Sequence, residues 1–222
     1  MVTFPRASSA LSSFIVAAGL VVAAMTSPIR VSADAAYTPP ATDAKAVELF
    51  AFKTDKTTNY EEKGSSFKVG RAEIFVNAPV SQVKAAILDY GAYSTFIPKF
   101  QKSKVLKRDG DATEVYLQIP ILHGAATIWA VERFDKPVAE GKGEKVSGVF
   151  QKGNVDDFRA TWHYRAVDDK HSIVSIDLFI APKLAVPEKA VTHEVQDACG
   201  DGVRAIKEHA EAAAKTMAQA KP

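Results

Sequence analysis

The sequence contains a single cysteine, Cys199, among its 222 residues. One cysteine excludes an intramolecular disulfide, a cysteine-based zinc site and a CxxC redox motif. An excess of charge of one sign is also missing, because 28 Lys and Arg face 26 Asp and Glu. A nucleic-acid-binding domain typically shows clustered basic residues and a pI above ~9. We therefore expect neither a disulfide scaffold nor a nucleic-acid partner.

Catalytic signatures are missing as well, since no Ser-His-Asp order, HExxH, P-loop or GxGxxG pattern is present. The adjacent carboxylates Asp156 and Asp157 point apart on a strand or loop, which is typical of a solvated turn. His193 and Asp197 are spaced for pairing on one helix face, but the sequence locates no further metal ligands. We expect no metal site, no cofactor and no catalytic residue.

The N-terminus lacks acidic residues and carries an uncharged, mostly apolar run over residues 14–25. A bilayer-spanning helix needs ~20 such residues, so this run suits the core of a signal peptide. Small residues allow cleavage after Ala33, and Ala35 offers a second candidate site. The pattern predicts a signal peptide over residues 1–33 and a soluble periplasmic or secreted protein. A buried N-terminal helix is the alternative.

Cleavage after Ala33 would also change the charge of the protein. It removes two of the 28 basic residues, Arg6 and Arg30, and none of the 26 acidic ones. The remaining chain is formally neutral, which disfavours electrostatic capture of polyanions.

The rest of the chain divides into a Pro-rich tether with a short extension (34–68), a folded domain (69–217) and a tail (218–222). Thr42 is the candidate cap of a short helix that ends near Phe50. Alternating apolar residues predict strands, and helical spacing predicts two short helices over 81–90 and 92–97 and a long one from Pro187 to about Met217. The predicted strands cover 69–76, 102–107, 113–119, 126–134, 145–150, 158–166 and 172–180. Their short connections indicate antiparallel pairing.

This order of elements, together with several short segments, resembles the START-like (SRPBCC) superfamily of polyketide cyclases, coenzyme Q-binding proteins and lipid-transfer domains. The segments are Ala72–Val76 with Asn77-Ala78-Pro79, Val83 through Tyr93, Phe96-Ile97-Pro98, Val105-Leu106, Phe158 through Trp162, and Pro187 onward. The likeness covers about residues 70–215. It implies an α+β helix-grip fold, in which a curved antiparallel sheet wraps around the long C-terminal helix and encloses an apolar cavity.

The period-two patterns assign inward faces to three strands. The inward sets are Phe158, Ala160, Trp162 and Tyr164; Val174, Ile176, Leu178 and Ile180; and Val115, Leu117 and Ile119. Residues 126–134 are ambiguous, because Ile128, Ala130 and Phe134 compete with Trp129 and Val131. Their inward face is left unassigned.

The apolar stripe of the long helix holds only small and medium residues, with no Phe, Trp, Tyr or Leu between Pro187 and Met217. Small residues opposite a curved sheet leave room for a ligand, because interiors otherwise pack densely. The alternative is a tight contact between helix and sheet, with Gly202 at the point of closest approach.

These patterns predict a carrier that binds an apolar small molecule, such as a lipid, sterol, quinone or polyketide-like compound, for lipid transfer. The candidate ligand-binding residues are Phe96, Ile97, Leu117, Phe150, Trp162, Tyr164, Ile176, Leu178, Val195, Cys199, Val203 and Ile206. The alternative is a cyclase- or hydrolase-type enzyme, for which the inward set offers only Tyr164 and Cys199 as acid–base groups. We expect a monomer that contacts membranes transiently.

Overall fold

The computed structural model describes residues 37–121, 124–183 and 185–220, and all of these except Tyr37 belong to the compact unit Thr38–Pro222. The predicted signal peptide lies outside the described residues. The described helices are α1 (Ala44–Phe52), α2 (Val80–Leu88), the 3₁₀ turn η1 (Tyr90–Ala92), α3 (Tyr93–Phe96) and α4 (Glu188–Gln219). The described strands are β1 (Lys56–Glu61), β2 (Lys68–Val76), β3 (Lys102–Asp109), β4 (Ala112–Ile121), β5 (Ala126–Phe134), β6 (Val138–Glu140), β7 (Gly143–Gly153), β8 (Val155–Ala166) and β9 (Ser172–Pro182).

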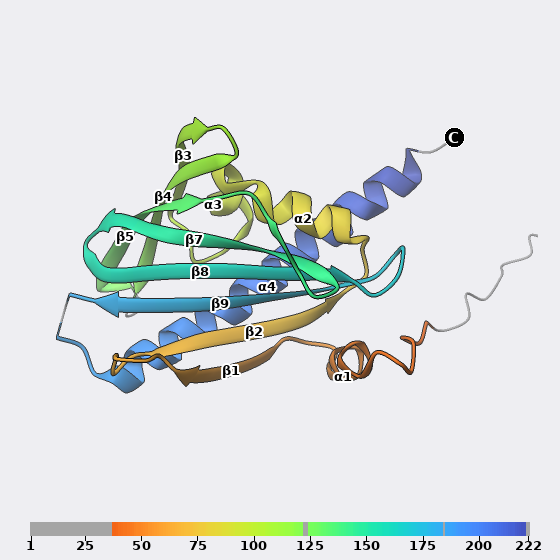
Figure 1. Ribbon diagram of the computed structural model, residues 1–222, viewed down its shortest axis with the longest axis horizontal. Coiled ribbons are helices and arrows are strands. Elements are labelled where there is room, and N and C mark those ends of the chain that lie inside the picture. The colour runs from red at the N-terminus through yellow and green to blue at the C-terminus, as the bar shows by residue number, and fades with distance from the viewer. Residues whose placement is uncertain (1–36, 122–123, 184, 221–222) are drawn as a thin grey trace, which may run out of the picture. The chain divides into compact units, whose positions relative to one another are not determined.

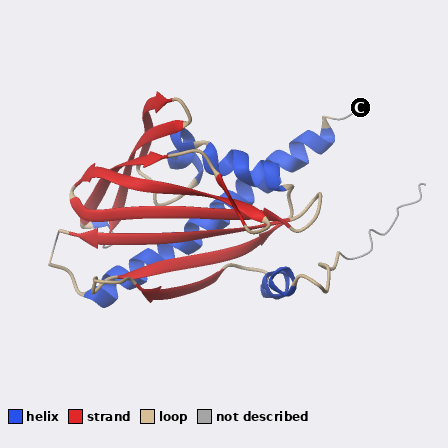
Figure 2. Cartoon of the chain, in the orientation of Figure 1, coloured by secondary structure: helices blue, strands red, loops and turns tan. Residues whose placement is uncertain are grey.

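The strands of the described part form one antiparallel sheet with the order β1-β2-β9-β8-β7-β5-β4-β3, and β6 pairs with β7 (Figures 1 and 2). From β3 onward, neighbours in the chain are mostly neighbours in the sheet, as short connections require. β2 and β3 lie far apart in this order, and the segment between them carries α2, η1 and α3. This arrangement confirms the predicted helix-grip fold.

Three register shifts interrupt the ladders of the sheet. The extra residues are Leu106 on β3, Gln151 on β7 opposite Val131 and Glu132, and Asp156 on β8. An extra residue in one strand bends that strand and increases its twist. The bulges therefore help the sheet to curve, and they change the direction of side chains near them.

α4 begins directly after Pro187, and its buried stripe includes Val195, Cys199, Val203 and Ile206. The spacing of these residues places them on one helix face, which packs against β2 and β9 of the sheet (Figure 1). Within the described residues, no helix has the length and apolar character needed to cross a membrane.

The helix lies close to the sheet at Gly70 of β2. A Cβ atom placed on Gly70 would lie 2.8 Å from Val195 Cγ1 and 3.2 Å from the Val195 carbonyl carbon. At Gly202 the corresponding distance, to Cη2 of Trp162, is 3.4 Å, an ordinary contact. The sheet glycine, more than the predicted helix glycine, therefore sets the separation between β2 and α4.

We expect Gly70→Ala to lower the free energy of unfolding by about 1–3 kcal/mol, because the added methyl group meets helix backbone that must shift. The matched control is Gly202→Ala. That change removes a helix glycine and should raise the free energy of unfolding by roughly 0.5–1 kcal/mol. Urea unfolding of the two variants measures both values. Effects of equal sign and size would contradict the close approach at Gly70.

The N-terminal extension is more structured than the sequence indicated. β1 pairs with β2 over Lys56–Glu61, although this strand was not predicted. Its residues are almost all exposed, so the alternation that marks a half-buried strand is missing. The short strand β6, also exposed, was missed for the same reason. The helix cap is Asp43, whose carboxylate accepts a hydrogen bond from the Ala46 N–H at 3.0 Å, rather than Thr42.

The inward face of β5, which the sequence left open, consists of Ile128, Ala130, Glu132 and Phe134. All four side chains are buried, and each residue lies opposite a buried residue of the neighbouring strand β4. Val131 on the opposite face is buried as well. The inward face of the sheet therefore contains a carboxyl group, Glu132, that the sequence pattern did not place there.

Candidate functional site

Two apolar pockets lie between the sheet and α4, and they share Lys99, Ile119, Leu178 and Ala198 in their walls. The end pocket is completed by Pro120, Ile121, Ile128, Ile180, Pro182, Val186, Val191, Glu194 and Val195. The central pocket is completed by Tyr93, Ile97, Phe100, Leu117, Glu132, Phe134, Phe158, Ala160, Trp162, Ile176 and Gly202. Most of these side chains are hydrocarbon, so both pockets suit an apolar occupant.

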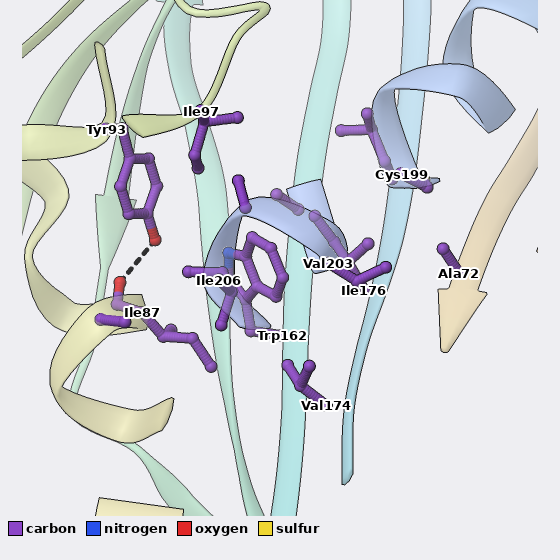
Figure 3. Packing of buried hydrophobic residues seen from close by; sticks show 14 of the residues in the cluster. Ala72, Ile87, Tyr93, Ile97, Trp162, Val174, Ile176, Cys199, Val203 and Ile206 are labelled. Atoms are coloured by element: carbon purple, nitrogen blue, oxygen red, sulfur yellow. Dashed lines mark hydrogen bonds between the residues drawn. The ribbon is translucent and has the colours of Figure 1, made fainter. Parts of the chain in front are cut away.

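Aromatic rings fill much of the central pocket. Trp162 reaches across to α4 at Gly202, and the Tyr90 ring stacks on Phe134 with centroids 4.5 Å apart. Figure 3 shows Tyr93, Trp162 and the helix residue Ile206 in one cluster, with the Tyr93 hydroxyl donating to the Ile87 carbonyl. Bulky sheet residues thus occupy space that the small helix residues leave.

Each pocket has a free volume of about 40 Å³. Sites for small molecules are commonly several hundred cubic ångströms, so a lipid-sized occupant requires these rings to move. The sequence left open either a space for a ligand beside the small helix residues or a tight contact between helix and sheet, and the structure shows part of each. The helix and sheet touch at Gly202, and free space remains along Ala198, which borders both pockets.

Lys99 ties the segment after α3 to α4 beside both pockets. Its ammonium nitrogen lies 3.8 Å from Glu194 Oε2 and 3.7 Å from Asp201 Oδ2. The Lys99 side chain is about one quarter exposed, so water screens these pairs and each contributes little to stability. These two pairs link the segment after α3 to α4 beside both pockets.

Glu132 lies in the central pocket with no measurable exposure, and neither carboxyl oxygen makes a hydrogen bond of normal geometry within the described part of the chain. Burial raises the pKa of this carboxyl well above its usual range; the Ala160 backbone opposes the shift, and Asp157 adds to it. Burial disfavours the charged form because the low-dielectric interior solvates it poorly. Glu132 is therefore a carboxyl group that favours its protonated state.

Six of the predicted ligand-binding residues line the pockets: Ile97, Leu117, Trp162, Ile176, Leu178 and Val195. The other six do not line either one. Cys199, Val203 and Ile206 are completely buried in the contact between α4 and the sheet. Phe96 stacks on His209 with ring centroids 4.4 Å apart, and Phe150 packs against the core.

The two residues that the sequence offered as acid–base groups lie away from the pockets. Tyr164 borders a polar surface hollow together with Glu144 and His163. The Cys199 sulfur faces Gly70, where a built Cβ atom would lie 3.3 Å from it, and burial raises the pKa of the thiol. A buried thiol of raised pKa is a poor nucleophile. Both side chains are buried in the core, as the inward assignment predicted, but neither lines the two apolar pockets.

Sequence reasoning missed Glu132, Ala198 and Lys99. Glu132 had no signal, because a glutamate within an ambiguous strand reads as solvent-exposed. Ala198 directly precedes the predicted Cys199, and helical spacing alone did not indicate which of the two residues borders the pockets. Lys99 follows the Phe96-Ile97-Pro98 segment, and its position over the pockets depends on contacts with α4 that lie far away in sequence.

A curved antiparallel sheet around a long helix, with apolar pockets between them, defines a helix-grip protein. Residues 76–204 match the family described as "Polyketide cyclase / dehydrase and lipid transport". This match covers more than half of the chain, and the protein belongs to that family.

Solved structures show the same fold at low sequence identity. The STAR-related lipid transfer protein from Xanthomonas axonopodis is 17% identical with a TM-score of 0.60, over 71% of this chain and 94% of that one. The human StarD13 lipid transfer and protein localization domain is 14% identical with a TM-score of 0.60, over 70% and 84%. Human STARD10 is 9% identical with a TM-score of 0.59, over 85% and 86%. No curated protein matches the sequence.

Proposed function

We propose that this protein is an exported carrier that binds an apolar small molecule between its sheet and α4 and serves in lipid transfer. The observation that carries the proposal is the pair of adjoining pockets, walled mainly by hydrocarbon and separated by the small residue Ala198. Membership of a family described by cyclisation and lipid transport supports it.

Binding in these pockets would draw its free energy from burial of apolar ligand surface, at roughly 25 cal/mol per Å². The aromatic rings and the segment that Lys99 ties to α4 would move apart to admit the molecule. Both pockets share Lys99, Ile119, Leu178 and Ala198, so separation of the helix from this part of the sheet would join them into one larger cavity.

The arrangement of titratable groups favours a carrier over a cyclase or hydrolase. General acid–base catalysis usually needs an acid and a base that face the same reacting atoms. Among the described residues lining the pockets, Glu194 pairs with Lys99, and the Tyr93 hydroxyl donates to the Ile87 carbonyl. Within that same lining, Glu132 has no titratable group paired with it, which supports binding over proton transfer.

Export rests on the N-terminal pattern, which has an apolar core too short to span a bilayer and small residues before Asp34. Mass spectrometry of the protein recovered from its own cells tests this part. We expect an N-terminus at Asp34, or at Ala36 if the second candidate site is used. A native protein that begins at Met1 or Val2 would refute export and leave ligand binding untouched.

Native mass spectrometry of the same material, followed by organic extraction, tests the carrier function. We expect a stoichiometric apolar compound, or uptake of one member of a lipid panel by the emptied protein. An empty protein that takes up no member of the panel would overturn the proposal. Turnover of a bound compound into a product of different mass would favour the enzyme.

A further inference from the structure

The central pocket contains a polar group whose bonding capacity is unused. Glu132 is completely buried, and neither of its carboxyl oxygens has a hydrogen-bond partner of normal geometry among the described residues. The other polar groups of the pocket are engaged, since Tyr93 donates to Ile87 and Lys99 pairs with Glu194 and Asp201. A buried carboxyl without partners is unfavourable for folding, so its presence calls for a partner supplied from outside the chain.

The surrounding backbone accommodates this carboxyl. Opposite Glu132, β7 carries one extra residue, Gln151, between the partners of Val131 and Glu132, so the ladder is interrupted beside the carboxyl. Gly148 of β7 lies against the carboxyl, where a Cβ atom would come within 2.6 Å of Glu132 Oε2. A residue with a side chain at position 148 would occupy the space of the carboxyl. The absence of a side chain at Gly148 therefore leaves room for an acid in an otherwise apolar wall.

We propose that Glu132 is the polar anchor of the central pocket and that the bound molecule is an apolar compound with one uncharged hydroxyl group. This inference rests on the proposed carrier function and specifies its ligand class. A hydroxyl group donates to one carboxyl oxygen and accepts from the protonated one, so both functions of the acid are satisfied. The rest of the molecule contacts the hydrocarbon walls.

Other head groups fit the pocket less well. An ether or ketone accepts a hydrogen bond but donates none, which leaves the carboxyl C=O unpaired. A primary ammonium group would require an ionised carboxylate, and burial disfavours that form of Glu132. A phosphate head group would bring negative charge beside an acid in a low-dielectric site.

The test compares two isomeric probes, 1-decanol and 1-methoxynonane, with decylamine as a cationic probe. The chain has two tryptophans, and Trp162 lines the central pocket while Trp129 stacks on Tyr116. A Trp129→Phe background therefore makes the fluorescence of Trp162 a direct reporter of occupancy. The variants are Glu132→Leu, which removes the hydrogen bond, and Glu132→Gln, which keeps a neutral donor and acceptor. Glu114→Leu on the opposite face of neighbouring β4 is the matched control.

We expect the parent protein to bind 1-decanol roughly ten-fold more tightly than its isomeric ether. Glu132→Leu should bind the two probes equally, while Glu132→Gln and Glu114→Leu should keep the preference. Equal binding by the parent protein, a preference that survives in Glu132→Leu, or tightest binding of decylamine would overturn the assignment of Glu132 and leave the carrier function standing. A parent protein that binds none of these probes and no lipid of the panel would overturn the carrier function itself.

Discussion

Ala198→Phe is expected to weaken the binding of an apolar probe by about 100-fold, because the added ring fills the space along which the two pockets meet. A pocket that loses room for part of an apolar ligand typically loses ~1–3 kcal/mol, or about 10–200-fold in affinity. Ala198 is the helix residue that borders both pockets, whereas the fully buried Val203 borders neither. Fluorescence of Trp162 with 1-decanol measures the loss.

The matched control is Ala212→Phe, which makes the same change on an exposed part of α4. This control should bind the probe like the parent protein. Circular dichroism and urea unfolding of both variants establish that they remain folded, so that a loss of binding reports the pocket. Unchanged binding by a folded Ala198→Phe protein would show that the occupied site lies elsewhere.

Glu132→Leu is expected to raise the free energy of unfolding at pH 7 by about 1–3 kcal/mol, the typical cost of a buried polar group without a partner, and by less at pH 5. In the unfolded chain the Glu132 carboxyl loses its proton near its ordinary pKa of ~4.3. In the folded protein its pKa is raised, so the folded state holds the proton to higher pH. Between the two pKa values the unfolded state binds fewer protons. The free energy of unfolding therefore falls by up to about 1.4 kcal/mol for each unit of rising pH.

Urea unfolding of the parent, Glu132→Leu and Glu132→Gln proteins between pH 5 and pH 8 measures this effect. Other carboxyls with shifted pKa values, including Asp43 and Asp177, are present in all three proteins, so their contributions cancel in the difference. The difference between parent and Glu132→Leu should grow as the pH rises. Parallel stability curves would show that Glu132 is solvated and ionised in the folded state, contrary to its burial.

The strands with clean alternation were predictable because their two faces have different environments. On β8 the apolar residues Phe158, Ala160 and Trp162 alternate with polar ones, and each of the three is buried as expected. The same holds for the inward residues of β4 and for the helical spacing that marks α4. One side of each element contacts the core and the other contacts solvent. Apolar residues therefore recur along the sequence with the period of the strand or helix.

The candidate site depended more on contacts between distant segments. The helix stripe predicted Val203 and Ile206 as pocket walls, yet these side chains are used in close packing against the sheet. Which small residue faces free volume follows from the separation that Gly70 and Val195 impose and from how far Trp162 reaches toward Gly202. No spacing within α4 encodes those two distances.

The sequence by itself determined the helix-grip fold, the inward faces of β4, β8 and β9, and a formal net charge of only +2. Only the tertiary structure decided which face of β5 points inward, and with it the position of Glu132. Both faces of β5 carry apolar residues, namely Ile128 and Ala130 on one face and Trp129 and Val131 on the other. The local pattern therefore does not indicate which face is buried. The inward face of β5 is fixed by its pairing with β4 and β7, because the register with both neighbouring strands determines which side chains point to the core.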